Sequence, residues 1–208
     1  MRRPVAWVAM AVVVALAAAV GVLMTGAILR VSGGGPVPMM SGWSDSTPGW
    51  DSMPGMRGAG AQGAAIGDLE SEYLVDMVAH HQEAIVAAGE LARSDRPEMR
   101  ALGASIVATQ TAQARQMREW LREWYPDHPV TSYRPMMRDL SGLSGDDLDR
   151  AFLHDMIGHH MVAVMMSQQL LRHGVEHAQV AALARDVRDG QRAEILLMRS
   201  WLASWFSS

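Results

Sequence analysis

The residues most able to do chemistry in this sequence stand in two copies of one block, Asp-Met-x-x-His-His. One copy consists of Asp76, Met77, His80 and His81, and the other of Asp155, Met156, His159 and His160. Imidazole and thioether groups bind soft metal ions, and a carboxylate either binds a metal or orients an imidazole through its second nitrogen. A single buried histidine beside an aspartate is more often a satisfied core pair. Because the whole block is duplicated, we expect at least one histidine of each pair to bind a metal ion.

The kinds of ligand present favour particular metals. Thioether with imidazole favours Cu(I) or Ag(I), and the chain has 17 methionines and no cysteine. Two further methionines on helical stripes, Met117 and Met198, join the candidate ligands, although packing is the alternative role for each of them. A di-iron site needs a glutamate on each of two helices and Glu-x-x-His on the others, whereas Glu194 is the one additional carboxylate in a suitable position. We therefore expect a metal-binding protein rather than an enzyme, with a di-metal oxidase as the weaker alternative.

A second repeated block shows that the chain is internally duplicated. Gln110 and Met117-x-x-Trp-Leu return as Gln191 and Met198-x-x-Trp-Leu. His159 follows His80 by 79 residues, and Met198 follows Met117 by 81, so an adjustable turn joins the two blocks of each repeat.

The elements that position these blocks are predicted to be helices. Apolar residues recur every three to four positions, and no segment alternates as a strand does. Asp68 is placed to cap the first helix, Pro97 to begin the second, Ser144 to cap the third and Gly174 to end it. The sequence thus predicts an all-α domain at 68–208, an antiparallel four-helix bundle of two duplicated hairpins. Its repeats are 68–125 and 145–206.

Hairpin geometry predicts what lies opposite each block. A turn near residue 96 places Gln113 opposite His80 and Met117 opposite Asp76. In the second hairpin Glu194 is then level with Asp155. An up-down-up-down topology would make the first and third helices parallel and let the histidine pairs converge on the bundle axis.

The first part of the chain predicts a membrane segment. Residues 4–29 carry no charge, and as a helix they would span about 39 Å, enough to cross a bilayer. Arg2 and Arg3 precede them, which keeps the N-terminus cytoplasmic and exports the remainder. We expect 1–31 to be an uncleaved single-pass anchor, with a cleaved signal peptide as the alternative. Residues 32–67, rich in Gly, Pro and Met, are expected to be a flexible linker.

The duplicated motifs resemble those of the domain-of-unknown-function 305 family over about residues 68–206. That resemblance implies a ferritin-like fold in a secreted or membrane-anchored bacterial protein. Some members are reported to bind copper, which implicates the four histidines and Met77, Met117, Met156 and Met198. The chain departs from the family pattern where Ala79 and Gly158 replace a proline, and where Gln113 stands in place of a glutamate.

These observations lead to a membrane-tethered, extracytoplasmic protein that buffers or delivers copper. The competing interpretation is a structural or interaction module of the cell envelope, with the histidines as a buried polar layer. A net charge of −4 argues against a nucleic-acid partner. The sequence specifies neither a protein partner nor a homodimer.

Overall fold

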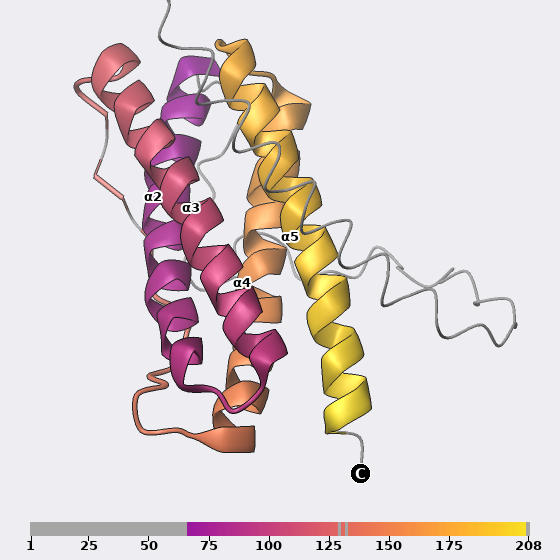
Figure 1. The fold of residues 1–208 in the computed structure, drawn as a ribbon. Coiled ribbons are helices and arrows are strands. Elements are labelled where there is room, and N and C mark those ends of the chain that lie inside the picture. Colours follow the sequence, from indigo (N-terminus) through magenta and orange to yellow (C-terminus); the bar gives the residue numbers. More distant parts are fainter. Residues whose placement is uncertain (1–65, 129, 132, 207–208) are drawn as a thin grey trace, which may run out of the picture. The chain divides into compact units, whose positions relative to one another are not determined.

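Four long helices make up the described part of the chain. A computed structural model describes residues 66–128, 130–131 and 133–206. The helices are α2 Ile66–Gly89, α3 Pro97–Trp124, α4 Gly145–His173 and α5 Ala178–Trp205, with a short 3₁₀ helix, η2 Glu90–Arg93, after the first (Figure 1). No strand occurs among these residues. The prediction of an all-α, four-helix domain is confirmed.

The predicted membrane anchor at 1–31 lies outside the described residues, as does the predicted linker except for its last two residues. Both stay predictions. Among the helices that are described, none is long and apolar enough to cross a membrane.

Local sequence signals explain most of the helix boundaries. Pro97 is the first residue of α3, where its missing N–H costs no hydrogen bond. Gly174 ends α4 with a φ of 96°, which favours glycine. Asp68, by contrast, lies inside α2, which begins at Ile66. Ser144 precedes α4 in an extended conformation, but its side chain makes no capping hydrogen bond.

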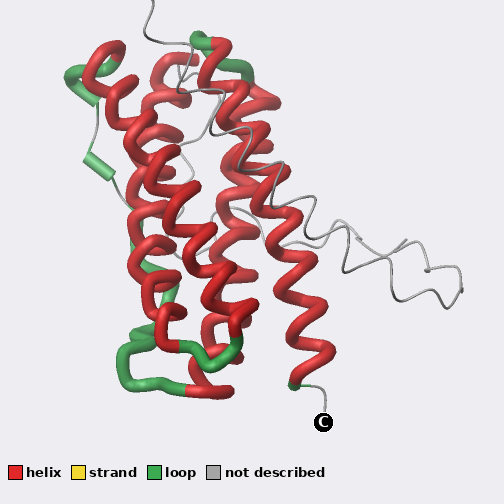
Figure 2. The backbone as a smooth tube through the Cα atoms, viewed as in Figure 1, coloured by secondary structure: helices red, strands yellow, loops and turns green. Residues whose placement is uncertain are grey.

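The helix directions differ from those expected. Tyr73, near the start of α2, shares a hydrogen bond of 3.0 Å with Ser167, near the end of α4. These two helices therefore run antiparallel beside one another, and the up-down-up-down expectation is wrong. The loop between α3 and α4 crosses the length of the bundle beside α2 (Figure 2). The loop, residues 125–144, is long enough to do so, and α4 therefore begins at the end of the bundle opposite to the one where α3 finishes.

Two apolar clusters fill the core, one toward each end of the bundle. The first includes Leu91, Met99, Ile106 and Phe152, and the second includes Leu74, Ala114, Leu170 and Val187. Each cluster draws on all four helices. The paired histidines belong to neither cluster and lie near the middle of α2 and α4, where the two clusters meet. The core is therefore apolar at both ends with a polar layer between.

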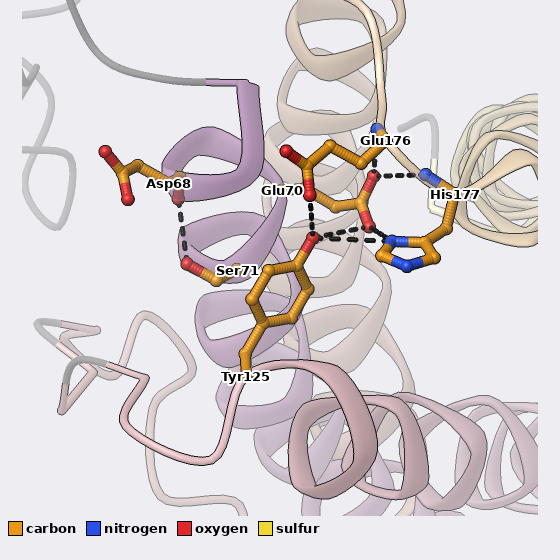
Figure 3. Close-up of polar contacts among 6 residues, drawn as sticks. All are labelled: Asp68, Glu70, Ser71, Tyr125, Glu176 and His177. Atoms are coloured by element: carbon orange, nitrogen blue, oxygen red, sulfur yellow. Dashed lines mark hydrogen bonds and ion pairs between the residues drawn. The ribbon is translucent and has the colours of Figure 1, made fainter.

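Buried carboxylates tie each hairpin to the turn of the other hairpin. At one end Glu70 of α2 accepts hydrogen bonds from the His177 backbone N–H at 3.1 Å and the Tyr125 hydroxyl at 3.0 Å (Figure 3). At the other end Asp149 of α4 accepts one from Arg96 at 2.8 Å. Both carboxylates are fully buried. These contacts set the position of α2 along the axis of α4. They therefore set the level at which the histidines of the two helices meet.

Candidate metal centre

The four histidines form a row across the middle of the bundle, and we refer to His81, His80, His159 and His160 as the histidine row. All four side chains are fully buried. The ring centroids of His80 and His159, which belong to different hairpins, are 3.6 Å apart. Each of these rings lies just over 6 Å from its sequence neighbour, at 6.3 and 6.2 Å. The two pairs converge as expected, although the topology that brings them together is different.

Every ring in the row has a hydrogen-bond acceptor at Nε2. The acceptors are the His159 carbonyl for His80 (2.9 Å), Gln113 Oε1 for His81 (2.8 Å), Glu83 Oε2 for His159 (3.2 Å) and Glu194 Oε2 for His160 (2.6 Å). An acceptor holds the imidazole proton on the nitrogen that it faces. The other nitrogen, Nδ1, then carries a lone pair.

The Nδ1 atoms of all four rings are buried and have no protein partner in the described structure. A buried polar atom without a partner costs about 1–3 kcal/mol, and folded proteins contain few of them. Five other buried atoms, in Gln110, Gln191 and Asp149, also lack a partner in the described structure, but the four imidazole nitrogens belong to one row of rings. Lone pairs on oriented, neutral imidazoles are what a metal ion binds.

Burial lowers the pKa of three of these imidazoles, those of His80, His81 and His159. It is the largest cause that lowers the pKa of His80 well below its ordinary value, and the neighbouring rings of the row lower it further. Burial also lowers the pKa of His81 to about 3, against the opposing hydrogen bond to Gln113. The pKa of His159 is lowered by burial too, although the Glu83 carboxylate opposes the shift. At neutral pH protons do not compete with a metal for these nitrogens.

The four candidate methionines are fully buried and divide between the two apolar clusters. Met77 and Met117 belong to one, and Met156 and Met198 to the other. Met77 and Met156 each lie one helical turn before a histidine pair. Thioethers therefore flank the row on both sides. Packing accounts for their burial, and their role as ligands stays a prediction.

The ligand sets of structural zinc and di-iron sites do not fit this layer. Within the described residues, no three histidine, aspartate or glutamate side chains are grouped so as to hold a metal ion. Structural zinc and di-iron sites need several such ligands at once. The donors that fit are unpartnered imidazole nitrogens with nearby thioethers, a soft set suited to Cu(I) or Ag(I).

The two aspartates of the repeated blocks face the interhelix loop. Asp76 accepts a hydrogen bond of 2.7 Å from the Thr131 hydroxyl, and Asp155 accepts two from the Arg138 guanidinium at 2.6 and 2.7 Å. The imidazoles take their Nε2 partners from other residues. The expectation that these carboxylates orient the rings is therefore wrong, and their role as metal ligands stays a prediction.

The predicted register is close in one hairpin and shifted in the other. Gln113 contacts His81, one residue from the expected His80. Glu194 contacts His160 rather than lying level with Asp155, a shift of about one helical turn. Three residues follow Gly174 before α5 begins, which moves the turn later than the sequence suggested.

Two residues of the site were absent from the sequence prediction, Glu83 and Tyr133. The Tyr133 hydroxyl donates to the Glu83 carboxylate and lies 3.3 Å from His159 Nε2. Glu83 stands three residues after His80 on the same helix, a spacing that could have drawn attention to it. Tyr133 lies in a loop, where no periodicity marks it.

Comparisons with known proteins find one family and several solved structures that are similar to this chain. The family described as "Domain of unknown function (DUF305)" matches residues 70–139 and 126–202. The structure titled "CopM in the Cu(I)-bound form" is similar over 66% of this chain and 98% of its own, with 29% identity and a TM-score of 0.59. CopM structures in Ag-bound, Cu(II)-bound and apo forms are similar as well.

Two further solved structures are DUF305 proteins. A putative secreted protein from Streptomyces coelicolor is 27% identical with a TM-score of 0.58, covering 67% of this chain and 93% of its own. A fragment from Deinococcus radiodurans is 31% identical with a TM-score of 0.57, covering 65% and 95%. No curated protein matches the chain.

Proposed function

The chain belongs to the DUF305 family, and from that premise we propose that its histidine row binds a soft monovalent metal ion, Cu(I) or Ag(I), for buffering, resistance or delivery. The observation that carries the proposal is the set of four buried Nδ1 atoms without protein partners. Each belongs to a ring whose Nε2 proton is held by an acceptor, so each lone pair is available to a metal.

The likeness to CopM supports the choice of metal. The related structures are titled with Cu(I), Cu(II) and Ag bound. Imidazole nitrogen and thioether sulfur are soft enough for the monovalent ions. The buried Met77 and Met156, one turn from the histidine pairs, are the sulfur ligands that we propose.

Binding without catalysis is part of the proposal. The buried row offers donors to a metal, but we assign it no substrate pocket, nucleophile or general base. We further propose that residues 1–31 tether the domain to a membrane and that it works outside the cytoplasm. There a methionine and histidine site avoids the oxidation to which cysteine ligands are prone.

Anaerobic titration of the full chain with Cu(I) against a competing chelator tests the proposal. The test variant is His80→Leu/His159→Leu, which removes the two central rings and fills their space with apolar groups. The matched control is His154→Leu/His173→Leu, which changes two exposed histidines of α4 outside the row. Helical content is followed by circular dichroism in every sample.

Stoichiometric binding by the wild type and the control, lost in a still helical test variant, is the expected result. If the wild type binds no Cu(I), the proposal fails. The histidine row is then a structural layer, and the chain is an interaction module whose partner is another protein of the cell envelope. If the test variant binds as tightly as the wild type, the metal site lies elsewhere in the chain.

A further inference from the structure

Residues 133–138, which we name the strap, belong to no helix and meet the histidine row through Tyr133, whose ring centroid lies 5.6 Å from that of His80. The Glu83 carboxylate on α2 connects the strap to the row. One oxygen accepts the backbone N–H groups of Met136 and Met137 at 2.6 and 2.7 Å. The other oxygen faces the Tyr133 hydroxyl and His159 Nε2. A single carboxylate therefore holds both the strap and a ring of the row.

In the part of the loop that the structure describes, the hydrogen bonds between the strap and the helices involve side chains of one partner or the other. Besides the two N–H groups on Glu83, the Tyr133 N–H donates to the Thr131 hydroxyl at 3.0 Å and the Arg138 N–H to Asp155 at 3.3 Å. Two further contacts, which we call the outer anchors, hold the ends of this region. Thr131, just before the strap, bonds to Asp76, and Arg138, the last residue of the strap, forms an ion pair with Asp155. None of these contacts belongs to a helical backbone ladder.

The side-chain acceptors of the row all sit on helices. Glu83 belongs to α2, Gln113 to α3 and Glu194 to α5, whereas the strap itself belongs to no helix. The strap leaves at the cost of its side-chain hydrogen bonds, the Arg138–Asp155 ion pair and the packing of Met137 against one apolar cluster, without breaking any helix, which makes it the weakest part of the cover. Since all four rings are fully buried, an ion from solvent needs some part of this cover to move.

The second repeat has no counterpart of this arrangement. Val162 stands where the repeat offset would place an equivalent of Glu83, and one loop connects the hairpins. The contact of His80 Nε2 with the His159 carbonyl likewise has no mirror image, because His159 Nε2 meets Glu83 instead. The two repeats contribute to the histidine row almost symmetrically, whereas the strap has no equivalent in the second repeat.

We propose that the strap is the gate through which a soft metal ion reaches and leaves the histidine row, with Glu83 as its latch. The proposal rests on the proposed function and adds the route of exchange to it. Met136, which is 39% exposed, puts a thioether on the strap itself, where an arriving Cu(I) or Ag(I) meets a soft ligand before the buried nitrogens.

The test variant is Thr131→Ala/Arg138→Ala in the full chain. It removes both outer anchors and leaves Glu83, the histidines and the methionines in place. The matched control is Arg188→Ala, which also removes an arginine bonded to aspartate through two nitrogens, but on α5. Stopped-flow measurement gives the rate of Ag(I) uptake, and transfer to a chelator gives the rate of release. Equilibrium titration gives the affinity.

The expected result is that uptake and release both become about tenfold faster in the test variant, since the lost contacts together contribute about 1.4 kcal/mol to closure. Affinity then stays within about twofold of the wild type, because a gate changes both rates alike. The control keeps wild-type rates.

Two outcomes overturn the gate while leaving the proposed function intact. One is unchanged rates in a test variant that binds Ag(I). The other is faster release with unchanged uptake, which would make the strap part of the binding site. Failure of the wild type to bind any metal overturns the proposed function itself, and the gate with it.

Discussion

The two hairpins carry the same blocks in the same order, yet the structure uses them differently. His81 of the first hairpin donates to a neutral amide, Gln113, whereas His160 of the second donates to a carboxylate, Glu194. The first hairpin alone supplies Glu83 and holds the strap. The two hairpins are therefore similar in sequence but unequal at a few contact positions. The predictions below test how far that inequality goes.

The largest expected effect is on stability in acid. His80 and His81 of the first hairpin and His159 of the second have lowered pKa values when folded. Below pH 6.5 the unfolded chain therefore binds protons that the folded protein does not. The free energy of unfolding consequently decreases as the pH is lowered. His81 contributes about 1.4 kcal/mol per pH unit from about pH 6.5 down to about pH 3, and His80 and His159 add to the slope in the same direction.

Urea unfolding of the metal-free chain at pH 7, 6 and 5 measures this slope. His81→Leu should reduce the slope by about 1.4 kcal/mol per pH unit. A control variant of an exposed histidine, His154→Leu, should keep the wild-type slope. Equal slopes in all three proteins would contradict the lowered pKa of His81.

The next effect compares the buried carboxylates at the two ends. Glu70→Ala leaves two backbone N–H groups before α5 without their acceptor, and we expect a loss of about 3 kcal/mol. Asp149→Ala should cost less, about 1–2 kcal/mol, because Arg96 keeps its ion pair with Asp146. Chemical denaturation at pH 7 gives both values. The reverse order would contradict the assigned contacts.

Helix packing also differs between the hairpins. A Cβ on Gly103 would lie 2.6 Å from the Ala88 carbonyl oxygen and 2.8 Å from Leu91 Cβ. The repeat offset pairs Gly103 with Ala184, which is fully buried without conflict. Gly103→Ala should therefore cost about 2 kcal/mol by forcing α2 and α3 apart. Ala184→Gly should cost about 1 kcal/mol through backbone entropy, and thermal unfolding distinguishes the two.

The smallest effect concerns the acceptors of the outer rings. A carboxylate partner makes an imidazole a better metal ligand, and losing one typically lowers affinity about 10-fold. Glu194→Gln should weaken Cu(I) binding by that factor, and Gln113→Glu should strengthen it. Chelator competition on the two single variants and their combination measures both changes. Identical affinities in all of them would place the metal away from His81 and His160.

Several features could be predicted from particular residues. Pro97 fixed the start of α3, and the register of the first hairpin followed to within one residue. The second register failed because the turn after Gly174 extends to His177, whose position depends on the contact with Glu70 of the other hairpin. Glu83 and Tyr133 were not predicted as site residues, because the contact between them depends on the path of the long loop between α3 and α4.

By itself, the sequence determined the helical repeats, the placement of a histidine pair on one helix of each repeat, and the soft chemistry of the candidate ligands. These depend on side-chain type and on the 3.6-residue period, which act locally. The tertiary structure alone decided that α2 and α4 are antiparallel, that each ring is held at Nε2 with Nδ1 left over, and that a strap lies across the row. Those features depend on contacts between residues far apart in the chain, and local periodicity carries no information about which distant groups meet.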